Sequence, residues 1–131
     1  MRQFIASGEG LPHWPNPISH AVVVDNICYL SGQLSISEDG KCIAGTAKEE
    51  ATRAFVNLFA AMKAANFSIG DLSFVDIAFI DLNDLPDVND LYAALFPEGQ
   101  RPARTIYQAA ALPFGGRVKV MGVAIKKKDI A

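Results

Sequence analysis

The sequence predicts an α+β fold with a mixed sheet and two helices on one face. Short, apolar, β-leaning segments alternate only partly with two amphipathic helical segments, in the order β-β-α-β-α-β-β. The 131 residues match the size of one domain, which we take to span residues 1–131. Half of the residues are hydrophobic, as in ordinary globular proteins.

The N-terminal part predicts a loop followed by a β-hairpin. Glycine and proline are dense in residues 7–17, which excludes regular structure there. Residues 21–24 and 27–34 then have strand composition, with a turn at 25–26. Gly32 lies inside the second strand, where a glycine marks either a bulge or a close approach to the backbone.

The strongest helical pattern begins after Thr46. Glu49 follows three residues later, which is a capping-box spacing. Apolar residues then recur every three or four positions between Ala51 and Ala65. Asn66 can end this helix in a left-handed conformation. A helix with one apolar face must lie on another layer, most simply a sheet.

The C-terminal half predicts three more strands and one more helix. Residues 74–81 are mostly apolar and indicate a buried strand. A helix follows from Leu85, with Pro86 in its first turn and Pro97 beyond its end. Residues 105–110 and 118–125 indicate strands on either side of a turn at 113–116. Two helices cannot cover both faces of this sheet, so we expect copies of the chain to cover the second face in a homo-oligomer.

Charge and composition exclude several classes of protein. The formal net charge of −2 argues against a nucleic-acid partner, whose phosphates require cations. No stretch approaches the roughly 20 apolar residues of a membrane span, and the N-terminus lacks a signal-peptide pattern. We therefore expect a soluble, cytoplasmic protein without a membrane partner. The two cysteines, Cys28 and Cys42, are too few for a disulfide scaffold and are expected to be buried or half-buried hydrophobes.

Arg104 is the main candidate for binding chemistry, because it enters an apolar strand where an unpaired cation is costly. Its partner is either an acidic side chain of this chain or a bound anion, for which the guanidinium fork fits a carboxylate. Ser31, Gly32 and Asn89 are weaker candidates. His20 either packs in the interior or contacts a ligand. With two histidines in the chain, a multi-histidine metal site within one chain is excluded.

Several segments occur along the chain in a specific order and spacing. They are Asn16-Pro17-Ile18-Ser19-His20-Ala21, Tyr29-Leu30-Ser31-Gly32-Gln33-Leu34, Asn57-Leu58, Asp81-Leu82-Asn83-Asp84, Val88-Asn89, Tyr92, Phe96-Pro97, Pro102-Ala103-Arg104-Thr105 and Leu112-Pro113. Together these segments resemble the reactive intermediate deaminase family, also called RidA, YjgF or L-PSP, and the resemblance runs almost end to end.

The resemblance implies a chorismate-mutase-like fold and a homotrimer with three clefts between neighbouring subunits. It implies a 2-iminobutanoate/2-iminopropanoate deaminase-like hydrolase that converts enamines or imines, such as 2-aminoacrylate, to 2-oxo acids and ammonia without cofactor or metal. Arg104 matches the arginine that holds the substrate carboxylate. The other residues implied at the substrate are Ile18, Ser31, Gly32, Asn89, Ile106 and Met121.

Three positions depart from the family pattern. Met121 stands where many relatives have a glutamate thought to orient water, Ile18 replaces a tyrosine, and Ile106 replaces a frequent cysteine. We therefore expect slower water attack and a bulkier, more hydrophobic carboxylate substrate, with His20 as a possible substitute polar group. The loss of the glutamate also favours an alternative, a non-catalytic small-carboxylate-binding or regulatory trimer. An L-PSP-type endoribonuclease is a third reading, which the acidic balance disfavours.

Overall fold

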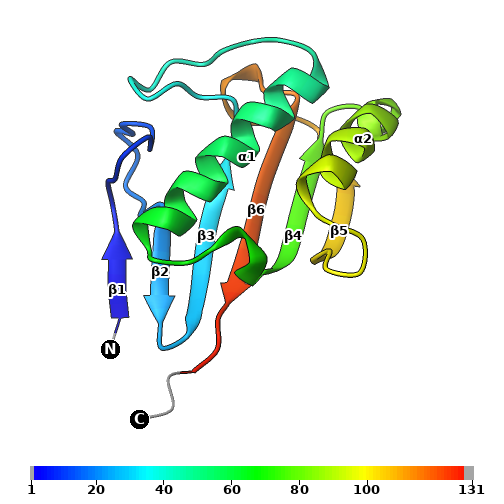
Figure 1. Ribbon diagram of the computed structural model, residues 1–131. Helices are drawn as coiled ribbons and strands as arrows, with labels where there is room; N and C mark the ends of the chain where they lie inside the picture. The colour runs from blue at the N-terminus through cyan, green and yellow to red at the C-terminus, as the bar shows by residue number, and fades with distance from the viewer. Residues whose placement is uncertain (1, 129–131) are drawn as a thin grey trace.

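A six-stranded mixed sheet with two helices on one face makes up the fold (Figure 1). The computed structural model describes residues 2–128. The strand order is β1-β2-β3-β6-β4-β5; β4 and β5 run parallel, and the other neighbours are antiparallel. The elements are β1 (Arg2–Ile5), β2 (Ala21–Val24), β3 (Ile27–Gln33), α1 (Ala47–Ala64), η1 (Ile69–Asp71), β4 (Leu72–Phe79), η2 (Leu82–Asp84), α2 (Leu85–Leu95), β5 (Ala103–Gln108), η3 (Pro113–Gly115) and β6 (Val118–Ile125).

The predicted α+β class, the hairpin, both helices and the last strand are confirmed, and one strand was missed. β1 adds an edge strand that pairs with β2 and precedes the predicted order. It has only four residues, of which three are exposed, so its short sequence carries little burial pattern. β4 and β5 each lie two residues earlier than predicted, within the usual uncertainty of strand ends.

The ends of α1 follow the predicted capping chemistry. The Thr46 side chain accepts a hydrogen bond from the Glu49 backbone N–H, and the Glu49 carboxylate accepts one from the Thr46 N–H, which completes a capping box. At the other end Asn66 has φ of 67°, the left-handed conformation expected there. Between these ends the buried residues of α1 face the sheet.

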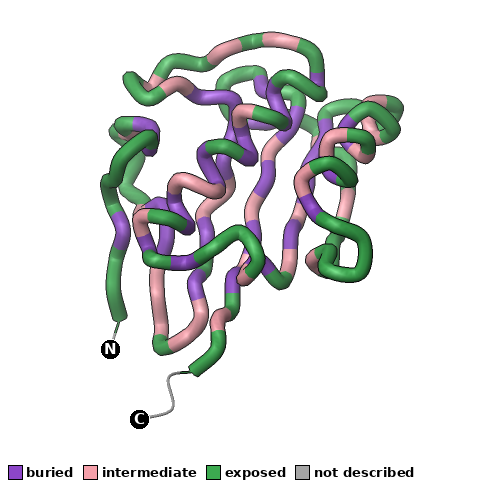
Figure 2. The backbone as a smooth tube through the Cα atoms, in the orientation of Figure 1, coloured by how far each residue is buried: buried purple, intermediate pink, exposed green. Residues whose placement is uncertain are grey.

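The main core lies between the sheet and the two helices. Figure 2 shows buried segments on α1 and on the strands beneath it. Phe55 and Leu58 of α1 pack there with Val75 and Ile77 of β4. A second, smaller cluster forms on loops around Ala78 at one end of the sheet.

The opposite face of the sheet is much less covered. Along β6 the buried residues alternate with half-buried ones, because successive side chains point to opposite faces. Tyr29 of β3 is 52% exposed, whereas its neighbours Cys28 and Leu30 are buried. We call the face that carries Tyr29, Met121 and Val123 the open face; Tyr29 pairs with Val123 in the β3–β6 ladder. The prediction that other copies cover this face is not tested by a single chain.

The two cysteines differ in environment. Cys28 is fully buried, as expected, but Cys42 is exposed, which corrects the prediction for that residue. Cys42 follows a polar turn, and its thiol approaches the Phe114 carbonyl at 3.7 Å. It lies in a loop joined by one isolated bridge to Ile36, so no covering layer buries it.

Asn57 gives a direct test of how α1 fixes the segment after β3. Its buried amide nitrogen donates to the carbonyls of Leu34 and Ile36 at 3.0 and 2.9 Å. Asn57→Ala leaves both carbonyls without this donor, so we expect the free energy of unfolding to fall by about 2 kcal/mol. Urea denaturation measures this change. Asn83→Ala, at an exposed turn, is the control; an equal loss in both variants would contradict this role for Asn57.

Candidate functional site

Arg104 lies on the edge strand β5 and reaches toward α2. It pairs in register with Val75, whose side chain is in the main core, so Arg104 projects to the helix-covered face. Its Nη1 donates to Asn89 Oδ1 at 2.8 Å, and its guanidinium carbon lies 4.7 Å from the centre of the Tyr92 ring. α2 therefore fixes the position of the guanidinium group.

No acidic side chain among residues 2–128 forms an ion pair with Arg104. The ion pairs in this part of the chain are Lys41–Asp39 and Arg117–Glu50. The first alternative from the sequence, a structural salt bridge, is therefore not what the structure contains. The guanidinium retains its charge and further N–H groups for another anion.

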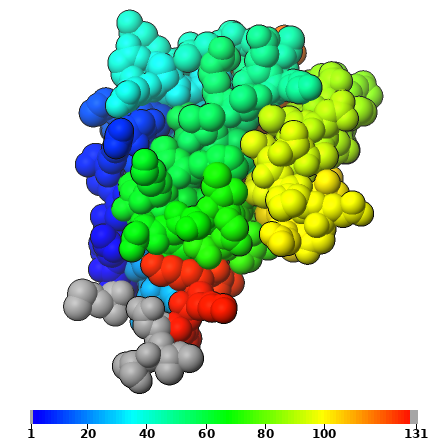
Figure 3. Space-filling view, in the orientation of Figure 1, coloured from blue at the N-terminus to red at the C-terminus, as the bar shows by residue number. Residues whose placement is uncertain are grey.

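An open pocket of about 400 Å³ adjoins Arg104. This volume is within the usual range for small-molecule sites. The lining residues are Asn89, Tyr92, Ala93, Arg101, Pro102 and Arg104. Figure 3 shows the segment that carries Arg101 on the molecular surface beside the helices, where solvent reaches it.

Tyr92 forms the wall of this pocket and has an unusual hydroxyl group. The residue is only 5% exposed, and its hydroxyl has no hydrogen-bond partner among residues 2–128. Burial raises the pKa of Tyr92 above its ordinary value, while the positive charges of Arg104 and Arg101 act in the opposite direction. Both arginines line the same pocket as Tyr92.

A second group of predicted site residues lies around β3. The Ser31 hydroxyl donates to the Ser19 carbonyl at 2.6 Å, and its N–H donates to the His20 carbonyl at 2.9 Å. These bonds hold the loop that carries Ile18, which is 48% exposed, against the strand. The structure thus brings Ile18, Ser31 and Gly32 together.

Gly32 shows both alternatives that its place in a strand left open, a bulge and a close approach of another group to the backbone. The register shifts between Leu30 and Gln33, which marks an irregularity of the bulge type. In addition, a Cβ on Gly32 would lie 3.0 Å from Cδ of Lys119, so that long side chain crosses close to the glycine. Gly32 leaves room for a neighbouring side chain there.

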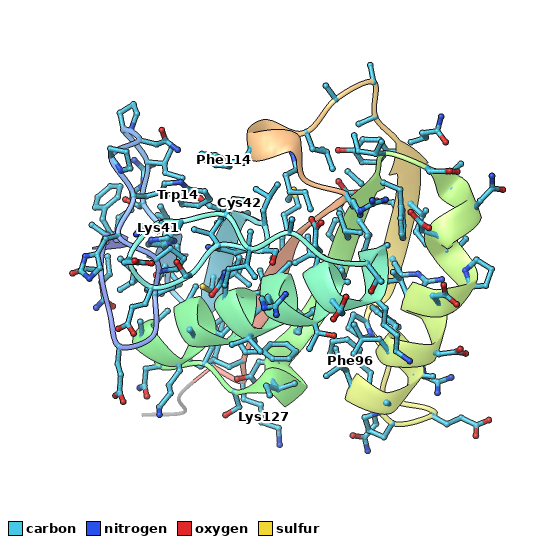
Figure 4. The ribbon with its side chains drawn as sticks, turned by 90° about the horizontal axis from the view of Figure 1, so that it is seen from above. Trp14, Lys41, Cys42, Phe96, Phe114 and Lys127 are labelled. Carbon is cyan, nitrogen blue, oxygen red and sulfur yellow. The ribbon has the colours of Figure 1, made fainter. Side chains whose placement is uncertain are left out.

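His20 is a packing residue in this structure. It is 2% exposed, its Nε2 bonds to the Pro12 carbonyl, and its Nδ1 bonds to the Gln33 amide nitrogen. Its ring stacks on Trp14, which in turn stacks on Phe114 with ring centroids 6.3 Å apart (Figure 4). Both ring nitrogens are occupied within the chain, so the structure favours the packing interpretation over contact with a ligand.

The two groups of site residues do not meet within one chain. Met121 pairs with Asp76 of β4, whereas Arg104 pairs with Val75, so their side chains project to opposite faces of the sheet. β3 and β5 are also separated by three strand spacings, roughly 14 Å. The Ile106 side chain shares the face of Arg104 and packs partly against the main core.

The remaining reactive groups give little support for covalent chemistry. Burial raises the pKa of the Cys28 thiol to about 11, so this thiol stays protonated near neutral pH. Within residues 2–128, no group of three or more His, Cys, Asp or Glu side chains could hold a metal ion. No helix in the described part is both long and apolar enough to cross a membrane. The lining of the Arg104 pocket includes two arginines and no acidic residue.

Of the pocket residues that were not predicted as site residues, Tyr92 and Arg101 carry polar groups. Tyr92 follows Asn89 by three positions on α2, a spacing that places both on one face of a helix. Arg101 precedes Arg104 by three positions in the sequence. It is exposed, but its Nε donates to the Phe96 carbonyl at 3.1 Å, which anchors it beside the pocket.

Comparisons with known proteins agree with this fold. The family described as Endoribonuclease L-PSP matches residues 12–126. The 2-iminobutanoate/2-iminopropanoate deaminase of Bos taurus is 36% identical over 127 residues, which cover 96% of this chain and 91% of that protein. The fold and site thus define a small α+β protein with an arginine-lined pocket at a sheet edge. The chain belongs to the RidA/YjgF/L-PSP family.

Solved structures show the same architecture. RidA from the Antarctic bacterium Psychrobacter sp. superposes with a TM-score of 0.87 at 32% identity, covering 95% of this chain and 99% of that one. E. coli TdcF with bound serine gives a TM-score of 0.86 at 26% identity, covering 95% of this chain and all of that one. These similarities confirm the family expected from the sequence.

Titration of Tyr92 tests the electrostatics of the pocket. We expect a tyrosine ionisation step above the ordinary value of 10.0, which is absent in Tyr92→Phe. Arg104→Ala should move this step to still higher pH, because a cation that favours the phenolate is removed. Because the folded-state pKa is raised, the stability that Tyr92 contributes is complete below the ordinary value and is lost as the pH rises through the folded-state pKa.

Ultraviolet absorbance measured against pH follows the ionisation. Arg2→Ala, a remote arginine on β1, is the control and should leave the step unchanged. If the tyrosine ionisation step occurs at the same pH in Arg104→Ala as in wild type, the Arg104 guanidinium does not act on Tyr92.

Proposed function

We propose that the protein hydrolyses 2-imino acids, and their enamine tautomers, to 2-oxo acids and ammonia. The observation that carries the proposal is the Arg104 guanidinium, held by Asn89 and Tyr92 beside an open pocket and without an acidic partner among residues 2–128. Relatives named 2-iminobutanoate/2-iminopropanoate deaminase lend support, and so does a structural relative whose bound serine carries a carboxylate.

The reaction needs little from the protein. An enamine tautomerises to an imine, and the oxygen of water adds to the carbon of the C=N bond. The resulting carbinolamine loses ammonia as its C–N bond breaks and the C=O bond forms, so one water is consumed for each ammonia released. Arg104 holds the carboxylate through charge-assisted hydrogen bonds and offsets negative charge near the reacting carbon. Positioning of this kind supplies part of the rate acceleration without a covalent step.

The complete site is assembled in this proposal from two subunits of a homotrimer. Arg104 and Asn89 supply one half, and the group around Ser31, with Ile18, Gly32 and Met121, supplies the other half from a neighbour. The separation of these halves in one chain supports this arrangement, because Arg104 and Met121 project to opposite faces. The exposed Tyr29 supports it as well, since burial against another copy would remove apolar area from water.

A non-catalytic carboxylate-binding trimer is the second candidate, and Met121 favours it. A thioether is a weak acceptor and cannot orient water as a carboxylate does. The endoribonuclease activity named in the family description receives no support from the net charge of −2.

Loss of Arg104 separates these candidates. We expect Arg104→Ala to lower kcat/KM for hydrolysis of the imine of 2-aminobutanoate by roughly 30-fold or more, the effect of truncating one partner of a charge pair. Arg104→Lys should recover part of this loss, because it retains the charge but not the planar fork. The imine is generated in place by an amino-acid oxidase, and 2-oxo acid release is followed against the uncatalysed rate.

Lys48→Ala, on the exposed side of α1, is the charge-matched control and should match wild type. Met121→Glu should raise the rate, since it adds a carboxylate that can orient water. Equal rates in wild type and Arg104→Ala would refute the proposal. If wild type binds carboxylates but does not accelerate imine hydrolysis, the result would favour the non-catalytic carboxylate-binding trimer.

A mixing experiment tests the division of the site between subunits. Arg104→Ala and Gly32→Leu each inactivate one half, and the leucine side chain would crowd Lys119. Equal amounts unfolded together and refolded should regain about one quarter of wild-type activity, because each mixed trimer has one intact cleft. Sedimentation must first show that each variant assembles. Activity no higher than that of the separate variants would place both halves in one subunit.

A further inference from the structure

Arg101 is the second guanidinium beside the Arg104 pocket, and its orientation is fixed. Phe96, labelled near α2 in Figure 4, lies just beyond the end of that helix, and its carbonyl accepts the Arg101 Nε–H at 3.1 Å. This bond leaves the two terminal nitrogens of Arg101 free to reach a ligand. Pro102 and Ala103 separate the two arginines, and the ring of Pro102 limits the flexibility of the backbone between them.

The lining of the pocket carries positive charge that has no ion-pair partner within residues 2–128. Its lining contains two arginines and no acidic residue, and neither arginine forms an ion pair in the described part of the chain. A single carboxylate bound to Arg104 would leave one positive charge unmatched. The chain as a whole carries a net charge of −2, so this local excess is not a general property of its surface.

Tyr92 lines the same pocket as both arginines. Its hydroxyl is buried and unpartnered in the described structure, and the positive charges of Arg104 and Arg101 both act on its pKa, against the larger effect of burial. Because Arg101, Arg104 and Tyr92 line one pocket of about 400 Å³, one small molecule in that pocket can lie beside both guanidinium groups.

We infer that Arg101 is a specificity-determining residue that binds a second acidic group, so that the site prefers dicarboxylic 2-imino acids over monocarboxylic ones. The inference rests on the proposed function for the reaction, with Arg104 holding the carboxylate next to the imine carbon. Arg101 then binds the distal carboxylate through its terminal nitrogens. The products are dicarboxylic 2-oxo acids and ammonia.

This preference differs from the hydrophobic substrate expected from the sequence. That expectation depends on Ile18, Ile106 and Met121, none of which lines the Arg104 pocket in one chain. Ile106 packs partly against the main core, and Met121 projects to the opposite face. The polar and charged lining described here lies next to Arg104 itself.

Arg101→Gln tests the inference, because it removes the charge and keeps a polar side chain. Two readouts are compared: calorimetric binding of the stable products 2-oxoglutarate and 2-oxobutanoate, and hydrolysis of the imines of glutamate and 2-aminobutanoate. We expect Arg101→Gln to weaken 2-oxoglutarate binding and glutamate-imine kcat/KM by about tenfold or more. The same measurements on the monocarboxylic compounds should change less than about threefold. Arg101→Lys should retain most of the preference.

The outcomes separate this inference from the proposed function. Equal effects of Arg101→Gln on both classes of compound, or a wild-type preference for 2-oxobutanoate, would overturn the inference. If Arg104→Ala abolishes hydrolysis while Arg101→Gln changes nothing, the reaction stands and the inference fails. If wild type accelerates no imine hydrolysis but binds 2-oxoglutarate more tightly in an Arg101-dependent way, the inference stands and the reaction is wrong.

Discussion

The rest of the structure depends on one constraint: the two helices cover only one face of the six-stranded sheet. The covered face contains the main core, where α1 and α2 exclude water from apolar side chains of the central strands. The same arrangement leaves β5 as an edge strand beside α2, where Arg104 can remain charged and hydrated. The open face keeps half-exposed apolar residues that a single chain does not cover.

Arg104 shows how neutral neighbours can position a cation without neutralising it. Asn89 accepts from one terminal nitrogen, and the Tyr92 ring lies under the guanidinium plane. Both contacts orient the group while preserving its charge, whereas a carboxylate partner would compete with any ligand. The contacts come from two turns of one helix, so the register of α2 against β5 determines where the guanidinium lies.

Local patterns predicted most of the fold but only part of the site. The Thr46–Glu49 spacing and the β-leaning composition of residues 118–125 are local signals, so the sequence reveals them directly. β1 depends on pairing with a distant strand, and its four residues contain no signal strong enough to identify it. Arg104, Asn89, Ser31 and Gly32 could be selected from residue type and resemblance.

The grouping of those residues could not be predicted in the same way. Whether Arg104 and Met121 project to one face depends on the strand order and on the ladder through β4, which no local pattern contains. Arg101 is a similar case, because its position is set by one hydrogen bond to a backbone carbonyl beyond α2. Backbone acceptors have no residue-type signature, and a polar side chain bound to one is indistinguishable from a solvated one in the sequence.

The strand order also determines how the molecule can be handled. β1 lies at one edge of the sheet and β5 at the other, with four strands between them. A fusion partner, fluorescent label or surface linker attached ahead of β1 is therefore separated from the arginine edge by the width of the sheet. Immobilisation through that end keeps the attachment point away from the guanidinium pair of the same chain.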